Sequence, residues 1–239
     1  MPIREALADL GTDIVVFVYD KNHFGRHERG TLGECAFITQ SKRDGGCVKA
    51  TGRFRDQSAI VARSQGQFVK TLWLLRHAKA VAGSDGLADR DRPLAPRGRD
   101  AAERIGRHLA ERGVRPDLVL CSPSLRTRET IDLVEKALGT ALSIEYEDDL
   151  YLASERDLRR RIEQVPDGVD SLLLVGHNPG IAELALQISV RGYADALAEL
   201  RRKFPTGALA ELRIHSPRWS QFARGCELVT FVTPKAIRD

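Results

Sequence analysis

Long hydrophobic runs are missing from this 239-residue chain. No apolar stretch approaches the roughly 18 to 20 residues that a membrane-spanning helix needs. Residues 1–9 carry two acidic side chains and no long apolar stretch, so they do not resemble a secretory signal. Hydrophobic residues still make up 42% of the chain, which is enough for an ordinary core. We therefore expect a cytoplasmic protein with no membrane partner.

Cysteine is also scarce. The chain has four cysteines and no Cys-x-x-Cys pair, which argues against a disulfide framework. Cys121 and Cys226 lie in apolar segments, so we predict that both are buried thiols. The chain also lacks a P-loop and lacks a cluster of aspartates that would hold magnesium.

A zinc site is the one metal hypothesis that the composition raises. Side chains of the right type lie in the polar N-terminal third, at His23, His27, Cys35 and Cys47. Their order and gaps match no common zinc spacing, and stray His and Cys residues in a polar segment usually bind nothing. We predict no metal and no cofactor.

Neither sign of charge is in large excess, with 37 basic against 33 acidic residues. Residues 1–70 hold 11 of the basic and 8 of the acidic side chains, so most of the surplus lies there. The remainder of the chain is nearly balanced, which argues against a nucleic-acid-binding face. We therefore expect no nucleic-acid partner.

The chain changes character near residue 70. Residues 20–58 are rich in Gly, Arg, Lys, Asp and Ser and have few apolar positions. Before residue 70, only the run at 13–19 has the pattern of a strand. The stretch 20–66 offers little to bury, so we interpret it as largely irregular or disordered. We predict a poorly structured N-terminal extension over 1–69 and a complete folded domain over 70–239.

The second part has a regular pattern of apolar runs and amphipathic stretches. The pattern predicts strands at 71–76, 117–121, 143–146, 171–175, 208–214 and 227–232. It predicts helices at 96–112, 123–138 and 154–165, and a further helix that ends at 189. Strands that alternate with helices, three of them continuous apolar runs, predict an α/β fold with a mainly parallel sheet and helices on both faces.

Three of the helices begin with a capping signal. Ser122 precedes Pro123, and Asn178 precedes a proline in the same way, so both are predicted as helix caps with proline in the first turn. Ser154 is predicted to cap the charged helix that follows it.

Three short motifs follow strands of the predicted sheet. They are Leu-Leu-Arg-His at 74–77, Ser-Pro-Ser-Leu-Arg-Thr at 122–127 and Val-Gly-His-Asn-Pro-Gly at 175–180. Each alone has an ordinary explanation as a surface pair, a capped helix or a plain turn. Ligands of such sheets bind beyond the carboxyl ends of the strands, where all three motifs lie. The motifs together therefore predict one site.

Side chains of these motifs suit phosphoryl chemistry. Neutral imidazole, with an ordinary pKa of roughly 6.5, makes His77 a competent nucleophile toward phosphorus. Arg76 and Arg126 offer rigid forks of N–H donors to phosphate oxygens. Arg126 lies in the first turn of its helix, where the free backbone amides also favour an anion. His177 precedes another helix and can donate to the same oxygens.

The motifs resemble the histidine phosphatase superfamily, and more closely its SixA phosphohistidine phosphatase branch. The resemblance covers about 71–239 and rests on Leu-Leu-Arg-His-Ala-Lys at 74–79, Asp89-x-x-Arg92-Pro-Leu followed by Gly98, Ser-Pro-x-x-Arg-Thr-x-x-Thr at 122–130, Val-Gly-His-Asn-Pro at 175–179 and Pro-Thr-Gly-Ala at 205–208. It implies a histidine phosphatase-like catalytic domain over 70–239, without a large cap.

The resemblance also assigns roles to single residues. It implies that His77 is the nucleophile and that Arg76, Arg126 and His177 hold the phosphoryl group. It implies substrate-binding positions at Arg92 and Asn178. Arg92 can equally be interpreted as a solvated loop arginine.

The proton donor of larger superfamily members has no clear equivalent here. Asp89 and Asp149 are candidates, and both also fit as surface acids. An alkoxide needs an acid to leave, whereas the imidazole of a phosphoramidate departs neutral once its ring is protonated. A missing acid therefore fits a phosphohistidine substrate better than a phosphate ester.

The short segments between motifs also leave little chain for a lid, and an open site suits a protein side chain better than a metabolite.

The sequence thus predicts a metal-independent phosphatase that works through a phosphohistidine intermediate and acts on phosphohistidine in proteins of the phosphotransfer type. Two alternatives stay open: a phosphomonoesterase for a small phosphate ester, and a non-catalytic phosphate-binding module. A mutase is disfavoured because it must shield the intermediate from water. The physiological substrate and the oligomeric state do not follow from the sequence.

Overall fold

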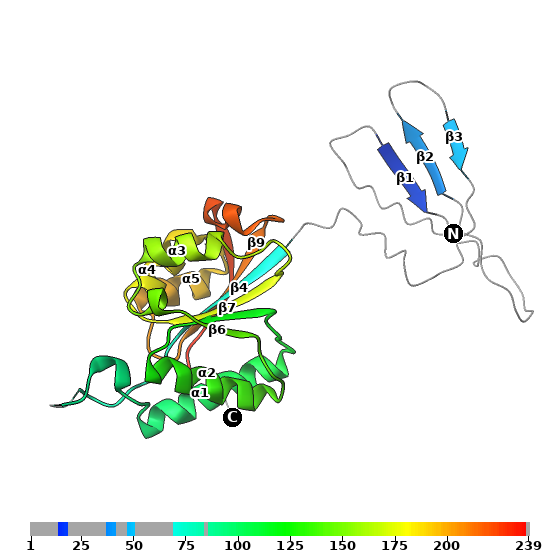
Figure 1. Cartoon of the computed structure of the whole chain (residues 1–239). Coiled ribbons are helices and arrows are strands. Elements are labelled where there is room, and N and C mark those ends of the chain that lie inside the picture. Colours follow the sequence, from blue (N-terminus) through cyan, green and yellow to red (C-terminus); the bar gives the residue numbers. More distant parts are fainter. Residues whose placement is uncertain (1–13, 19–36, 42–46, 51–68, 84–85, 238–239) are drawn as a thin grey trace, which may run out of the picture. The chain divides into compact units, whose positions relative to one another are not determined.

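A computed structural model of the chain describes residues 14–18, 37–41, 47–50, 69–83 and 86–237. The chain divides into two compact units, Met1–Ser64 and Gln65–Asp239 (Figure 1). Most of the predicted N-terminal extension lies outside the described residues. His23, His27 and Cys35, which were considered for zinc, lie outside them as well, and of Cys47 only the backbone is described, in a strand.

Three short strands are described in the first unit. They are β1 (Ile14–Val18), β2 (Phe37–Ser41) and β3 (Cys47–Ala50), and they form an antiparallel sheet in that order. The first coincides with the strand predicted at 13–19. The other two lie within the stretch interpreted as irregular, where few apolar positions mark a strand in the sequence.

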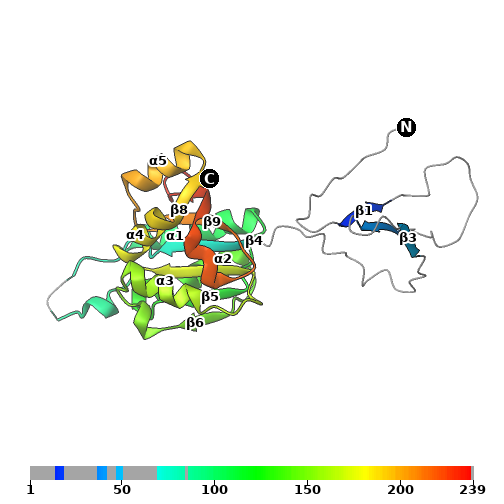
Figure 2. The same ribbon diagram turned by 90° about the horizontal axis from the view of Figure 1, so that it is seen from above.

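The second unit is built on a seven-stranded sheet. Its strands are β4 (Val69–Arg76), β5 (Leu118–Cys121), β6 (Ile144–Tyr146), β7 (Ser171–Gly176), β8 (Ser189–Gly192), β9 (Leu209–His215) and β10 (Cys226–Val232). Their order is β6-β5-β7-β4-β9-β10-β8, with β6 and β8 at opposite edges (Figure 2). The pairs among β6, β5, β7 and β4 are parallel, while β9 is antiparallel to both neighbours. The predicted, mainly parallel sheet is confirmed.

Helices cover both faces of this sheet (Figure 1). On one face lie α1 (Pro96–Glu111) and α2 (Leu125–Leu138), and on the other lie α3 (Glu155–Glu163), α4 (Gly180–Ile188) and α5 (Ala194–Arg202). Short 3-10 helices occur at Asp89–Asp91, Asp148–Leu150 and Trp219–Arg224. The sequence pattern did not predict β8 or α5.

Alternate side chains of β4 separate two hydrophobic clusters. Leu72 and Leu74 pack with the apolar sides of α3 and α4, whereas Trp73 and Leu75 pack with those of α1 and α2. All four are almost fully buried, as expected for a central strand covered on both faces. This double burial fixes the end of β4, where Arg76 and His77 begin the site.

Two of the predicted helix caps are wrong. The helix α2 begins at Leu125 with Ser124 as its cap, because Ser122 still belongs to the strand end, where its N–H donates to the Val175 carbonyl oxygen at 3.0 Å. Pro123 therefore precedes the helix.

The helix α4 begins at Gly180, and the Asn178 amide donates to the Phe204 carbonyl oxygen at 3.0 Å instead of serving as its cap. Ser154 does cap α3, by accepting from the backbone N–H of Asp157.

The predicted burial of the thiols is confirmed, and desolvation raises the pKa of Cys121 and of Cys226 to about 12.

The variant Gly98→Ala tests how closely α1 approaches the loop after β4. A Cβ atom at this position would overlap the carbonyl oxygen of Lys79, which already accepts from the Ala95 N–H at 2.8 Å. Because backbone must move to relieve the overlap, we expect the free energy of unfolding to fall by about 1 to 3 kcal/mol. Urea denaturation measures it. Gly168→Ala is the matched control, since nothing lies within 4 Å of the added atom, and an equal loss in both variants would contradict the close approach.

Candidate active site

The carboxyl ends of β4 and β7 and the first turn of α2 contribute to one cavity of about 180 Å³, which we call the histidine pocket. Its lining consists of Arg76, His77, Lys79, Ala80, Arg92, Arg126, Leu152, His177, Asn178 and Thr206. All six residues predicted as site residues are therefore brought together. The other four lining residues, Lys79, Ala80, Leu152 and Thr206, were not predicted individually.

The ring of His77 has the orientation and charge of a nucleophile. Its Nδ1 lies 2.7 Å from the Ala78 carbonyl oxygen. A carbonyl only accepts, so the ring proton lies on Nδ1 and Nε2 keeps its lone pair. Burial, together with the positive charges of Arg126, Arg76 and Arg92, lowers the pKa of His77 to about 4. The imidazole is therefore neutral near pH 7, the form that attacks phosphorus.

The second histidine lies beside the first, with the ring centroids of His77 and His177 5.2 Å apart. His177 is buried, and its Nε2 lies 2.8 Å from the Ser122 hydroxyl oxygen. Burial and the neighbouring positive groups lower its pKa to about 3, so it too is neutral. When the hydroxyl donates to Nε2, the ring proton lies on Nδ1, a buried atom with no hydrogen-bond partner among the described residues.

Two guanidinium groups are held against the site by backbone carbonyls. Arg126 is 3% exposed and donates to both the carbonyl and the carboxylate of Asp89. Arg76 donates from Nη1 to the Phe204 carbonyl oxygen at 2.8 Å, while its Nε is buried without a partner in the described part of the chain. These groups retain N–H donors for an anion.

Arg92 is fixed in place and is not a freely solvated loop arginine. It donates twice to the Val81 carbonyl oxygen, at 3.1 and 2.7 Å, and once to the Asp89 carboxylate at 2.7 Å. Asn178 is likewise engaged, because its amide nitrogen binds the same Phe204 carbonyl that accepts from Arg76.

Asp89 is a charged anchor for the pocket arginines. Its carboxylate accepts from the Tyr151 hydroxyl at 2.7 Å and from Arg92 and Arg126. These hydrogen bonds hold the pKa of Asp89 well below its ordinary value, and the bond from Tyr151 contributes most. It is ionised at neutral pH and has no proton to give. Asp149, the other candidate acid, is exposed and does not line the histidine pocket.

Two contacts of the site escaped sequence reasoning. Ser122 orients His177 although it comes from a different strand end, and Tyr151 supports Asp89 from the segment before α3. Ser122 stood within a recognised motif, which was a usable signal. No sequence signal marks Tyr151, because it reaches the site only through the tertiary fold.

Comparison with known proteins identifies the family. Residues 72–165 match the histidine phosphatase superfamily, branch 1. An uncharacterized protein of Mycobacterium tuberculosis is 39% identical over 164 residues, which are 67% of this chain and 100% of that protein. The chain belongs to the histidine phosphatase superfamily.

Solved structures agree with this assignment. A candidate phosphohistidine phosphatase SixA from Nakamurella multipartitia is 31% identical and covers 70% of this chain and 96% of its own, with a TM-score of 0.61. A second candidate of the same name, from Agrobacterium tumefaciens, is 34% identical, with a TM-score of 0.58 and coverage of 69% and 98%. The expected resemblance to SixA-like members is confirmed.

The described residues contain neither a membrane-spanning helix nor a group of metal-binding side chains. No helix there is both long enough and apolar enough to cross a membrane. In the same residues, no three His, Cys, Asp or Glu side chains are grouped so that they could hold a metal ion.

Burial of the histidines predicts a pH-dependent stability. His77 has a pKa of about 4 in the folded chain, against roughly 6.5 in an unfolded one. Between these values the unfolded chain binds more protons, so the free energy of unfolding falls as the pH is lowered through this window. His77→Asn removes one such group and should lose stability less steeply. Thermal denaturation at several pH values compares the two proteins, and parallel curves would contradict a neutral, buried ring.

Substitution of Asp89 separates a positioning residue from a proton donor. Asp89→Asn weakens the hold on two arginines, so we expect kcat/KM to fall by roughly 10- to 100-fold. The factor should be the same for 4-nitrophenyl phosphate and for phenyl phosphate, although phenoxide is the poorer leaving group. A clearly larger loss with phenyl phosphate would show that Asp89 protonates the leaving group.

Proposed function

We propose that residues 70–239 form a metal-independent phosphatase that acts on phosphohistidine in proteins through a phosphohistidine intermediate at His77. The observation that carries this proposal is a neutral imidazole with its Nε2 lone pair unprotonated, in one small cavity with three guanidinium groups. A nucleophile and fixed cations are the two requirements of phosphoryl transfer when positioning and electrostatics supply the catalysis.

In the first step, Nε2 of His77 attacks phosphorus while the P–N bond to the substrate imidazole breaks. The substrate ring carries a proton on its other nitrogen, so the electron pair of the broken bond leaves it as neutral histidine. In the second step, water attacks phosphorus, the P–Nε2 bond breaks and its electrons return to Nε2. One proton of the water stays on the attacking oxygen and the other passes to a second phosphate oxygen, so the products of the two steps are histidine and inorganic phosphate.

The three guanidinium groups and the second histidine of the pocket each have a role in these two steps. Arg76, Arg92 and Arg126 face the cavity and stabilise the charge that spreads over the non-bridging oxygens. When the Ser122 hydroxyl donates to Nε2, the ring proton of His177 lies on Nδ1, which then donates to one of the same oxygens. Backbone carbonyls and Asp89 hold the guanidiniums in place before substrate arrives, so little reorganisation accompanies the reaction.

The acids of the site support a phosphoramidate over an ester. Three hydrogen-bond donors hold Asp89 ionised, and Asp149 does not line the cavity. An alkoxide leaving group without an acid loses roughly 10²- to 10⁴-fold in rate, whereas a protonated imidazole needs none. The two similar structures that are named candidate phosphohistidine phosphatases agree with this choice.

A substrate comparison with wild type and His77→Ala tests the proposal. We expect kcat/KM for a phosphohistidine peptide to exceed that for any of a panel of sugar and nucleotide phosphates by about 100-fold or more. His77→Ala should lose at least about 10³-fold on every substrate, and EDTA should leave the wild-type rate unchanged.

Other outcomes favour the alternatives. Faster turnover of one metabolite would establish a small-molecule phosphomonoesterase. Tight phosphate binding without turnover of any substrate would establish a binding module. Arg156→Ala is a suitable control variant, since this side chain lines neither the histidine pocket nor the larger cavity described below.

A further inference from the structure

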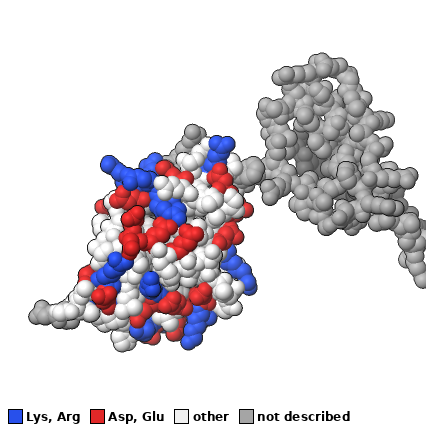
Figure 3. Space-filling model, viewed as in Figure 1, with Lys and Arg blue, Asp and Glu red and all other residues white. Residues whose placement is uncertain are grey.

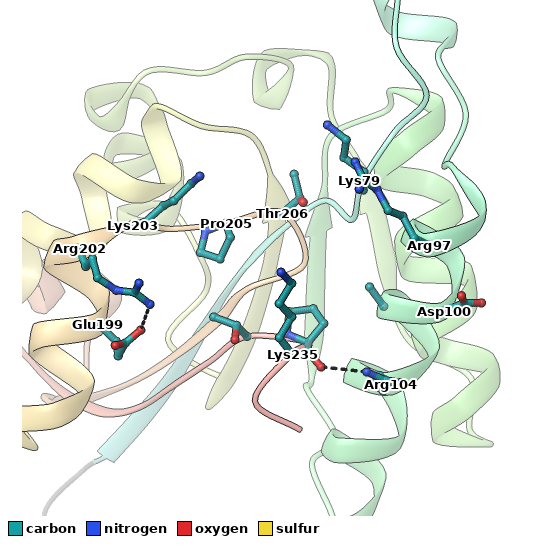
Figure 4. A pocket seen from close by; sticks show the side chains of 13 residues that line it. Lys79, Arg97, Asp100, Arg104, Glu199, Arg202, Lys203, Pro205, Thr206 and Lys235 are labelled. Carbon is teal, nitrogen blue, oxygen red and sulfur yellow. Dashed lines mark hydrogen bonds and ion pairs between the residues drawn. The ribbon is translucent and has the colours of Figure 1, made fainter. Parts of the chain in front are cut away.

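A second cavity, of about 690 Å³, adjoins the histidine pocket, and we call it the basic groove. It lies between α1, the end of α5 and the segment after β10 (Figure 4). Its lining consists of Lys79, Arg97, Asp100, Ala101, Arg104, Glu199, Arg202, Lys203, Pro205, Thr206, Thr233, Pro234 and Lys235. Lys79 and Thr206 line both cavities, so the groove leads from the rim of the histidine pocket.

Positive charge is concentrated in the groove. Six of its lining residues are Lys or Arg, and only Asp100 and Glu199 are acidic. The chain beyond residue 70 is otherwise nearly balanced in charge, and the face seen in Figure 3 shows basic and acidic side chains intermingled. The excess in the groove is therefore a local feature and does not follow from the composition of the domain.

Most of these cations have no partner. Arg202 pairs with Glu199 at 2.6 Å, and Arg104 donates to the Pro234 carbonyl oxygen. The side chains of the other four, Lys79, Arg97, Lys203 and Lys235, are exposed and form no hydrogen bond or ion pair within the described part of the chain. Four cations beside a cavity, with little acid to neutralise them, attract an anionic ligand.

The arrangement of the cations favours an extended ligand. Arg97 and Arg104 project from one face of α1, two turns apart, while Lys203 stands opposite at the end of α5 and Lys235 lies between these walls (Figure 4). The donors of the histidine pocket converge on one point, whereas these cations are spread along the groove. Long, mobile side chains spread along two walls suit several separate carboxylates better than one compact phosphate group.

We propose that the basic groove binds an acidic segment of the protein substrate, next to the phosphohistidine that enters the histidine pocket. This inference rests on the proposed function for its substrate. Asp and Glu side chains beside the phosphorylated residue meet the unpartnered cations in the groove. The groove thereby determines which phosphohistidine proteins the enzyme prefers, mainly through binding and not through the chemical step.

Two synthetic peptides test the groove. Both carry one phosphohistidine, which is flanked by Asp and Glu in the first peptide and by Ser and Gln in the second. For the wild type we expect kcat/KM to be about tenfold higher for the acidic peptide, through a lower KM, and the preference should shrink as salt is added. Equal kcat/KM for the two peptides would overturn the proposal.

Charge reversal locates the effect. Lys203→Glu combined with Lys235→Glu should abolish the preference for the acidic peptide and leave the neutral peptide within about twofold. The matched control combines Arg115→Glu with Lys136→Glu, which changes the net charge equally at exposed positions outside both cavities. The control should keep the preference, and an equal loss in both double variants would overturn the assignment to the groove.

Failure of the proposed function is distinguishable from failure of the groove. If neither peptide is hydrolysed, the proposed function fails, and fluorescence anisotropy with the unphosphorylated acidic peptide still tests the groove. Weaker binding to the Lys203/Lys235 double variant than to the control supports the proposal, and equal binding overturns it. Binding of inorganic tripolyphosphate that depends on the same two lysines, without binding of the peptide, would assign the groove to a small polyphosphate instead.

Discussion

The structure depends on the gathering of guanidinium groups around two partly desolvated imidazoles. The same positive charges have two effects: they help to keep His77 and His177 unprotonated, and in the proposed mechanism they bind the oxygens of the phosphoryl group. Burial is the larger cause of both lowered pKa values, and the cations add to it. The mutual repulsion of these cations is offset by backbone carbonyls and by the ionised carboxylate of Asp89, which accepts hydrogen bonds from Arg92 and Arg126.

The fold holds this arrangement by tying the strand ends to one loop. The Phe204 carbonyl accepts from Arg76 and from Asn178, and the N–H of Gly207 lies within hydrogen-bond distance of the carbonyls of Arg76 and His77. The segment between α5 and β9 thus braces both histidine-bearing motifs. The same segment supplies the boundary between the histidine pocket and the basic groove, at Thr206.

Much of the sheet was predictable, and so was the meeting of the three motifs at one cavity, because strand ends follow from apolar runs and parallel strands bring those ends to one edge. What escaped prediction depends on contacts between distant segments. Ser122 was interpreted as a helix cap, since its pairing with His177 exists only after β5 and β7 lie together. From the sequence, Asp89 fits equally as a surface acid or as the acid that protonates the leaving group. Only the fold brings the three groups that donate hydrogen bonds to it around its carboxylate. The basic groove combines side chains from α1, α5 and the last segment, a grouping that no local pattern encodes.

The most direct measurement of the central claim is a rapid-quench experiment with a peptide that carries radiolabelled phosphohistidine. If the neutral Nε2 of His77 attacks phosphorus, label must appear transiently on the enzyme, in a form that is stable to alkali and lost in acid. Peptide mapping should place the label on His77, and the label should be absent from His77→Ala. Label on another residue, or turnover by His77→Ala at the wild-type rate, would contradict the account.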